Sequence, residues 1–354
     1  MKLKLLTIAI SLTLSAGGAL ACASCGCSLN TDLGYQGMGS NPGWAADFRY
    51  DYLDQNQLRS GTSSISSAKA VGIVNPATRQ QAEVEGFTKN NYLTASLDYN
   101  NGDNWGATIV LPFIQREHLT YGSDASSSGG LAGWPSGANG YQSKTTGLGD
   151  VKLIGRYFGF SEQKNWGFQL GVKLPTGNNA QTAPASATAL AAGTSVVAVD
   201  PGLQLGTGST DLIIGAYKYG HIFNIDDWGY FGNVQFQSVI DPKSTPSNID
   251  ALGQGGSYRQ GNGLNINLGI NYQGFENWTP TVQLNFIDKK MDSGTAADTW
   301  STGGTLAYLT PGLLYTASNS VQVYSNLQLP IYQSLNGIQL TPHFVASIGV
   351  RLHF

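Results

Sequence analysis

All three cysteines of the chain fall within six residues, in the run Cys22-Ala-Ser-Cys25-Gly-Cys27. Thiols at this spacing can form a local disulfide with one thiol left over, bind Cu(I) or another soft metal, or exchange disulfides with a partner protein. A zinc finger is disfavoured, because three thiols have no histidine nearby. Covalent haem attachment is excluded, because Gly26 stands where Cys-x-x-Cys-His requires histidine. Disulfide, soft-metal site and redox contact stay open as alternatives.

The four histidines do not indicate a catalytic site. Nucleophilic hydrolysis needs a serine, a histidine base and an orienting polar group brought together. His118 and His343 fall in or beside long polar connectors, His221 lies in a short turn, and His353 is at the end of the chain. None has a serine at a spacing that identifies a pair, so we expect no enzyme.

Residues 1–21 are typical of a secretory signal peptide. The segment begins with two lysines, which an apolar run follows. Ala19-Leu20-Ala21 then places small residues at the −3 and −1 positions of a cleavage site. Cys22 would then be the first mature residue. Lipidation of Cys22 is disfavoured, because the usual leucine stands three residues before the cysteine and Leu20 stands two before it. The segment 22–43 would carry the cysteines into an oxidising compartment.

The composition indicates a membrane barrel better than a soluble or helical membrane protein. Charged residues make up 12% of the chain, against about 25% in soluble domains. The mean hydropathy is −0.13, far too polar for a bundle of membrane-spanning helices. An apolar outer face combined with a polar interior gives both values together. The net charge of −3 offers no basic footprint for nucleic acid.

Amphipathic runs of period two recur along the chain and are separated by connectors that alternate in length. The runs lie at 44–53, 91–99, 105–114, 149–159, 166–174, 210–219, 229–238, 263–272, 279–288, 304–315, 321–332 and 343–354. Short connectors cover 100–104, 160–165, 221–227, 273–278 and 317–320, and long ones 54–90, 115–148, 175–209, 239–262, 289–303 and 333–342. The pattern predicts an all-β fold, a single 12-stranded antiparallel transmembrane β-barrel over 44–354.

Tryptophan recurs where a short connector feeds a strand. Trp105, Trp166, Trp228 and Trp278 hold this position, and Trp44 has the equivalent place in the first run. Tryptophan prefers the membrane–water interface, so these five side chains are expected to form a girdle at one rim of the barrel.

The last run alternates apolar and polar residues and ends on Phe354. It resembles the terminal strand of bacterial outer-membrane barrels, in which a final phenylalanine is part of the assembly signal. The resemblance implies a place in the outer membrane of a Gram-negative cell, in contact with its lipid, with both ends of the mature chain on the periplasmic side. It also implies recognition of Phe354 by the barrel-assembly machinery.

The charges of the strands share the phase that faces inward. A charge on the lipid face would cost ~2–4 kcal/mol at the midplane, so only this phase is plausible. Opposite charges inside could be structural pairs or a selectivity filter, and the sequence leaves both open. At this strand number a narrow or loop-constricted lumen is expected. The predicted lumen-lining charges are Asp47, Arg49, Asp51, Asp98, Lys152, Arg156, Lys173 and Arg351.

Three Gly-rich segments carry a more specific likeness. They are 146–150 (TGLGD), 172–177 (VKLPTG) and 205–211 (LGTGSTD). Together they resemble the outer-membrane transporter family named for the MetA pathway of phenol degradation, which implies uptake of hydrophobic or aromatic compounds. The same glycines and aspartates are also explained as residues that end strands and form the bends between them. The cysteine cluster departs from the family pattern.

Two functions follow from these patterns. The first is a porin-like channel or transporter for small solutes across the outer membrane. The alternative is a non-conducting binding or scaffold barrel, whose Cys22, Cys25 and Cys27 bind copper or engage a periplasmic redox partner.

Overall fold

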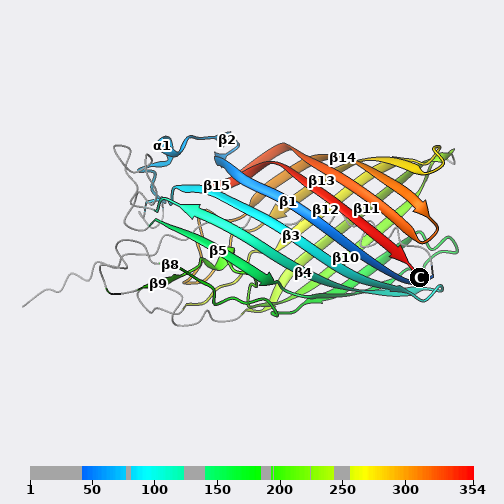
Figure 1. Ribbon diagram of the computed structural model, residues 1–354, viewed down its shortest axis with the longest axis horizontal. Coiled ribbons are helices and arrows are strands. Elements are labelled where there is room, and N and C mark those ends of the chain that lie inside the picture. Colours follow the sequence, from blue (N-terminus) through cyan, green and yellow to red (C-terminus); the bar gives the residue numbers. More distant parts are fainter. Residues whose placement is uncertain are drawn as a thin grey trace, which may run out of the picture.

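A computed structural model gives the structure of the 354-residue chain. It describes residues 42–76, 81–122, 140–184, 193, 195–223, 225–242 and 256–354. Antiparallel neighbours follow one another around a single closed sheet, which β15 completes by pairing with β1 (Figure 1). In order, the wall consists of β1 (Gly43–Gly61), β3 (Glu85–Asn100), β4 (Trp105–Thr120), β6 (Lys152–Tyr157), β7 (Trp166–Lys173), β10 (Thr210–Ile222), β11 (Ile225–Asp241), β12 (Gly263–Tyr272), β13 (Trp278–Lys289), β14 (Gly304–Ser318) and β15 (Val321–His353).

The closed antiparallel barrel matches the prediction, but the strand count is not reproduced exactly. β15 is one element of 33 residues that pairs with β14 as far as Leu335 and with β1 from Ile338 onward. The expected long connector 333–342 is therefore wrong, because most of it is strand. Gly337 has a φ of +54° between the two arms. Glycine adopts this left-handed conformation without steric cost, and it allows the chain to reverse here without a long loop.

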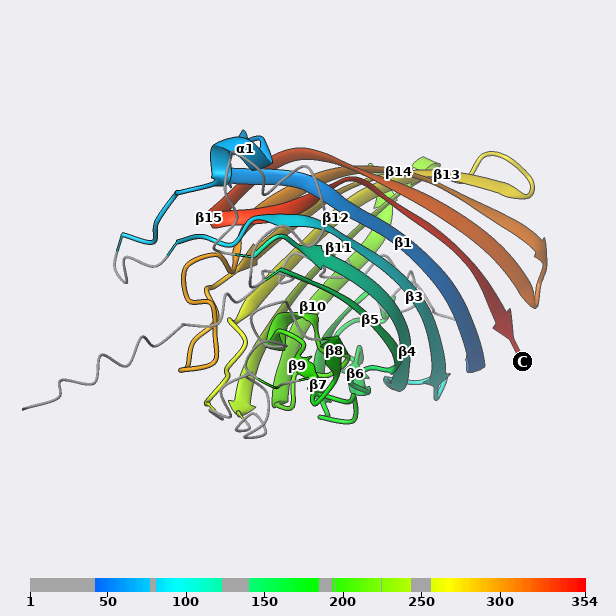
Figure 2. The same cartoon turned by 60° about the vertical axis from the view of Figure 1, so that its left-hand side comes forward.

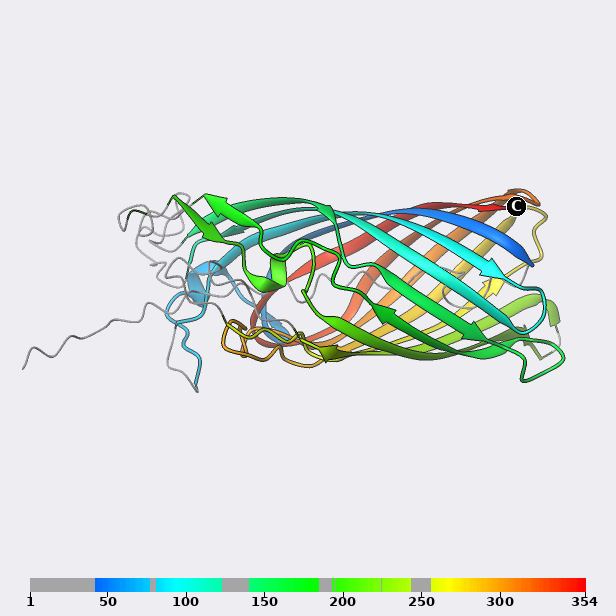
Figure 3. The ribbon, with the colours of Figure 1, turned by 90° about the horizontal axis from the view of Figure 1, so that it is seen from below.

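The wall is uneven in height, because its strands differ greatly in length. β1 has 19 residues, whereas β6 has 6 and β7 has 8. The long strands sweep obliquely along the barrel (Figures 2 and 3). Much of the expected connector 54–90 and the start of 115–148 belong to these extended strands.

Exposed and buried side chains alternate along the strands as a single-layer wall requires. The outward phase of β12 carries Leu268 and Ile270, which are exposed, while Asn267, the residue before Leu268 on the opposite phase, is fully buried. The buried phase therefore faces the interior of the barrel, and the apolar phase faces outward.

The five tryptophans at the starts of strands lie at one end of the barrel, which we call the tryptophan rim. Trp44, Trp105, Trp228 and Trp278 are largely exposed, and Trp278 packs on Tyr315 with ring centres 4.5 Å apart. The C-terminus lies at the same end (Figure 1). Two hydrogen bonds, Trp44 N to Phe354 O at 3.0 Å and Phe354 N to Trp44 O at 2.9 Å, join the first and last strands there.

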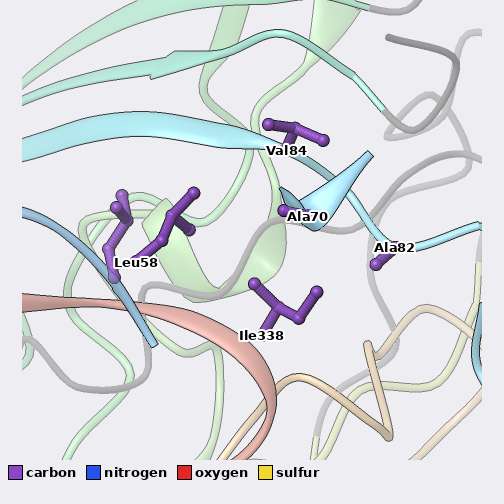
Figure 4. Packing of buried hydrophobic residues seen from close by; sticks show 6 residues of the cluster. Leu58, Ala70, Ala82, Val84 and Ile338 are labelled. Carbon is purple, nitrogen blue, oxygen red and sulfur yellow. The ribbon is translucent and has the colours of Figure 1, made fainter. Parts of the chain in front are cut away.

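An apolar cluster covers the opposite end. The connector after β1 forms β2 (Ser63–Ser64) and the single turn α1 (Ser67–Ala70), whose N-cap Ser66 accepts a hydrogen bond from Lys69 N. Its apolar side chains meet β1 and β15 in a cluster of Leu58, Ala70, Ala82, Val84, Ile338 and Leu340 (Figure 4). Within the described part of the chain, no helix combines the length and apolar character that crossing a membrane requires.

Candidate functional site: the barrel interior and its inserted connector

The structure buries the predicted lumen-lining charges on the interior phase of the wall. Lys152 is half-buried, and the remaining seven are buried: Asp47, Arg49, Asp51, Asp98, Arg156, Lys173 and Arg351. Because the outward phase is exposed and apolar, burial in this closed wall places these side chains toward the interior.

Ion pairs and hydroxyl groups surround the interior carboxylates. Arg156 Nη2 lies 2.6 Å from Asp98 Oδ1, and Thr108 donates to the same oxygen. Arg49 Nε lies 2.9 Å from Asp51 Oδ2, while Ser347 donates to Asp51 Oδ1. Pairing of this kind is what buried ions need to be tolerated. Of the two alternatives left by the sequence, the contacts favour structural pairs over a ring of free charges.

The three Gly-rich segments converge in space at one place in the wall, which we call the motif junction: Asp150, Lys173, Gly177, Gly206, Thr207, Ser209 and Asp211. Asp150 is its hub. Asp150 Oδ1 accepts from Gly177 N at 3.0 Å, and Oδ2 accepts from Thr207 N at 2.9 Å and from Lys173 Nζ at 2.9 Å.

Lys173 connects the hub to the start of β10. Its Nζ lies 3.3 Å from Asp211 Oδ1, donates to Ser209 O at 3.1 Å and also contacts Thr207 Oγ1. Asp211 accepts further from Gln237 Nε2 at 2.6 Å. All three charged groups are buried, so one ammonium is shared by two carboxylates away from water.

Two glycines allow the backbones to touch at the junction. A Cβ on Gly177 would lie 2.7 Å from Gly206 Cα, and a Cβ on Gly206 would lie 2.6 Å from Asp150 Oδ1. Both distances are shorter than van der Waals contact, so close approach requires glycine at both positions. The simpler explanation, that these glycines and aspartates only end and begin strands, is therefore incomplete. The motifs also hold two distant segments together.

The wall is interrupted next to the junction. β4 pairs with β6 through Trp105–Val110 and then with β5 (Tyr141–Leu148) through Phe113–Thr120. The predicted strand 149–159 thus begins at Lys152, and the preceding residues 141–148 form a separate strand that was expected to be connector. Among the described strands, β5 has its ladder with β4 alone. β7 ends and β10 begins at this level, so the connector 174–209 leaves and re-enters the wall at the motif junction.

Part of the connector 174–209 folds into the barrel. The sequence pattern gives 175–209 as a long connector and predicts a narrow or loop-constricted lumen, but it does not say which connector enters the lumen. The connector includes β8 (Thr182–Pro184), β9 (Val196–Ala198) and the 3₁₀ turn η1 (Pro201–Leu203). Arg116, buried on the interior phase of β4, donates to Gly202 O at 3.3 Å and to Gln204 O at 3.2 Å. Its Nε also donates to Asn90 Oδ1 at 2.6 Å.

Leu205 then packs against four interior side chains of neighbouring strands. The cluster, which we call the apolar constriction after the role proposed for it below, consists of Leu53, Tyr92, Ile114, Val345 and Leu205. The first four come from β1, β3, β4 and β15. No signal in the sequence singles out Leu205, because Leu190, Val196, Val197 and Val199 are further apolar residues of the same Ala- and Thr-rich connector.

Three connectors place buried carboxyl groups outside the strands. Burial, and secondarily the charge of Asp298, raises the pKa of Glu83 to about 7. Burial also raises the pKa of Asp200 well above its ordinary value, with the charge of Glu83 adding to the effect. Asp298 has a raised pKa mainly through burial. The sequence analysis singled out none of these residues.

A polar cavity of about 440 Å³ opens inside the tryptophan rim, and we call it the vestibule. Its lining includes Tyr219, His221, Asn271, Gln322, Arg351 and His353. Cys22, Cys25 and Cys27, for which a disulfide, a soft-metal site and a redox contact are the alternatives, lie outside the described residues. Within residues that the structure describes, no group of three His, Cys, Asp or Glu side chains is arranged to hold a metal ion.

No family model matches the chain, and no curated protein sequence matches it either. Solved structures do match. The COG4313 outer membrane channel from Pseudomonas putida F1 aligns with a TM-score of 0.57 at 12% identity, over 89% of this chain and 96% of that chain. This likeness shows that the two proteins share a fold, a closed antiparallel β-barrel.

Two further alignments have lower TM-scores. The TodX monoaromatic hydrocarbon channel, in a deletion mutant, gives a TM-score of 0.44 at 10% identity over 89% of this chain and 91% of that chain. A Pseudomonas aeruginosa FadL homologue gives 0.41 at 11% identity over 96% of each chain.

Proposed function

We propose that this chain is an outer-membrane channel for small solutes, with hydrophobic or aromatic compounds as its substrate class. The observation that carries the proposal is the apolar constriction inside an otherwise polar barrel. Leu205 reaches it from an inserted connector and meets Leu53, Tyr92, Ile114 and Val345. The same proposal makes the chain a transporter without enzymatic activity: the buried pair of His118 Nδ1 and Thr88 Oγ1, 2.8 Å apart, has no exposed surface for a substrate to reach.

An apolar constriction discriminates between solutes by the cost of removing their water. A hydrated ion or sugar loses hydrogen bonds on entering such a passage and regains none from leucine, isoleucine or valine side chains. An apolar or aromatic molecule loses little and gains contact with the same side chains. The expected preference agrees with the substrates implied by the resemblance of the three Gly-rich motifs.

The proposal includes an orientation in the outer membrane. Cleavage after residue 21 frees a short N-terminal segment, and the tryptophan rim, Phe354 and that segment face the periplasm. The exposed apolar phase contacts lipid, and Phe354 is read by the assembly machinery. We count β5 and β6 as one interrupted crossing and the two arms of β15 as two, which gives the twelve crossings that an even-numbered barrel needs.

Uptake by intact Gram-negative cells tests the substrate class, since their outer membrane bars many apolar compounds. Cells that express the protein should take up a radiolabelled neutral aromatic compound faster than cells without it. Leu205→Trp, which enlarges the side chain at the constriction, should abolish the gain, while Leu268→Ala on the exposed outer face should not. Equal stimulation of aromatic and sugar uptake would contradict the proposal.

One observation favours the alternative of a non-conducting barrel that acts through its cysteines. Several interior amides are almost completely buried, among them Gln169, Gln283 and Gln328, so the interior is closely filled at their level. A barrel of this kind would lose its activity when residues 22–27 are deleted, and the deleted segment would account for all high-affinity Cu(I) binding. A channel would keep its uptake activity after the same deletion.

A further inference from the structure

Three connectors bring carboxyl groups together at the end of the barrel opposite the tryptophan rim. Glu83 precedes β3, Asp200 stands directly before η1 in the inserted connector 174–209, and Asp298 belongs to the connector between β13 and β14. Glu83 and Asp200 are each 8% exposed. The charge of Glu83 acts on Asp200, and the charge of Asp298 acts on both. We call these three residues the carboxyl cluster.

The carboxyl cluster holds buried oxygens without partners. Both carboxyl oxygens of Glu83 and Oδ2 of Asp200 have no hydrogen-bond partner among the described residues. An unpaired carboxylate is costly away from water, so the protonated acid is favoured. Burial accordingly raises the pKa of Glu83 to about 7, and the hydroxyl of Thr120 beside it offsets only part of this effect.

The surroundings of the carboxyl cluster do not neutralise it. β1 and β15 present apolar side chains, and Ala82 and Val84, on either side of Glu83, lie in the same apolar cluster (Figure 4). The other charged or titratable groups around it are Glu85 of β3, Arg116 and His118 of β4, Tyr141 of β5, and Asp292 with Lys289. Both cations are engaged elsewhere, because Arg116 donates to carbonyl oxygens of the inserted connector and Lys289 pairs with Asp292 at 3.3 Å.

Glu83 and Asp200 differ in how firmly the chain holds them. The segment that carries Glu83 extends the ladder of the wall, because Val84 exchanges backbone hydrogen bonds with the residues that follow β4. Asp200 lies on the inserted connector, which the side chain of Arg116 fastens to β4. If both carboxyl groups lose their protons, like charges repel between a fixed wall and this connector. The connector is therefore the part that moves.

Asp200 is linked through η1 to the apolar constriction. Its Oδ1 accepts a hydrogen bond from Gly202 N at 2.7 Å, which fixes the carboxyl group to the first turn of η1. Leu203, at the end of η1, is fully buried against Tyr141, and Leu205 follows two residues later in the constriction. Displacement of Asp200 thus carries Leu205 with it.

We propose that protons held between Glu83 and Asp200 lock the inserted connector in place, and that loss of these protons releases the connector together with Leu205. The barrel is then constricted in acid and opens as the pH rises. The lock itself does not depend on which solute passes, whereas its effect on passage rests on the proposed channel function.

The sign and size of the effect follow from proton linkage. A carboxyl group whose pKa is raised in the docked state favours docking below its ordinary pKa of 4.5, and this support is lost as the pH rises through about 7. If release of the connector lets water reach Glu83, this residue alone changes the docking equilibrium about 30-fold between pH 5.5 and pH 8.5. Asp200, whose pKa is also raised by burial, adds to the change.

Hydrogen exchange of residues 199–205 in the refolded barrel at pH 5.5 and pH 8.5 tests the lock. Protection factors, which remove the intrinsic pH dependence of exchange, should fall about 30-fold or more in the parent protein. The double variant Glu83→Gln with Asp200→Asn imitates the protonated cluster and should stay protected at both pH values. Glu117→Gln, the matched control, removes a carboxyl group that pairs with the exposed Lys144 on β5 and should behave as the parent does. Equal pH dependence in the parent and the double variant, or none in the parent, overturns the proposal.

Conductance of the same proteins separates the lock from the proposed function. The parent should give small steps at pH 5.5 and larger ones at pH 8.5, and the double variant should give small steps at both. A loss of protection at pH 8.5 with unchanged conductance would support the lock and contradict the control of passage by Leu205. Protection that persists at pH 8.5 in the parent overturns the lock, whatever the conductance.

Discussion

Removing the ammonium group of Lys173 should release the inserted connector from the wall. Lys173→Met keeps most of the side-chain length but leaves Asp150 and Asp211 buried without their shared cation. Removing one partner of a buried ion pair costs ~3–5 kcal/mol, because the remaining charge is uncompensated. The contacts of Lys173 with Thr207 and Ser209 fasten the connector, whereas Asp211 is its ladder partner in the wall, so the cost falls on the docked state of residues 199–209 and on the pairing of β7 with β10.

The one cation and two carboxylates of the motif junction allow variants with different charge balance to be compared. Lys173 serves two carboxylates, so Asp211→Asn leaves one cation with one anion and should cost much less than Lys173→Met. In the double variant Lys173→Met with Asp211→Asn, only Asp150 stays uncompensated, and part of the loss should be recovered. This order of effects follows from charge balance and not from side-chain volume.

Hydrogen exchange of residues 199–209 measures the docked state directly. A loss of ~3–5 kcal/mol accelerates exchange through local opening by about 100- to 4000-fold, if that opening limits exchange in the parent protein. The strands β12 and β13, remote from the junction, serve as the internal control. Equal protection of residues 199–209 in Lys173→Met and in the parent would refute the role given to the motif junction. A double variant less protected than Lys173→Met would refute the charge argument.

Three further variants probe other parts of the structure. Gly206→Ala places a methyl group 2.6 Å from Asp150 Oδ1, so it should lower stability by ~1–3 kcal/mol and make the connector sensitive to protease. The control Gly263→Ala has nothing within 4 Å of its added Cβ and should have neither effect. Arg156→Met leaves the buried carboxylate of Asp98 without its cation and should lower the free energy of unfolding by ~3–5 kcal/mol. Lys290→Met, at an exposed ion pair, should lower it by at most ~1 kcal/mol. Similar midpoints in a urea titration of the two variants would contradict this expectation. Burial raises the folded-state pKa of Glu83 from 4.5 to about 7. The folded state therefore holds the proton more tightly than the unfolded state does. As a result, the free energy of unfolding falls as the pH rises through this window, by ~3 kcal/mol at most. Glu83→Gln should weaken that dependence in melting curves taken from pH 4.5 to 8, and a steeper or unchanged dependence would argue against Glu83 as its source.

The barrel could be predicted from the sequence because its determinants are local. The alternation that ends in Phe354 and the short turns before Trp105 and Trp278 depend on neighbours along the chain, and the structure shows a closed antiparallel sheet built from such strands. The reversal at Asn336-Gly337 is equally local, but the polar residues around it favour a loop over 333–342, where the structure has strand.

The inserted connector could not be predicted in the same way. Its position depends on Arg116 and Asp150, which meet carbonyl and amide groups many residues away in the chain. No periodicity announces such contacts. The glycines of the three motifs marked the segments involved, but a single sequence does not say that Gly177 and Gly206 lie against each other.

Single-channel conductance of the refolded mature protein, compared between the parent and Leu205→Ala, tests the central claim most directly. The account predicts small conductance steps for the parent and larger ones for Leu205→Ala, because truncating Leu205 widens the apolar constriction and weakens the docking of the connector. Leu268→Ala, which truncates an exposed outward leucine, should match the parent. Identical steps for the parent and Leu205→Ala, or silence in both, would contradict the claim that this constriction controls passage through the barrel.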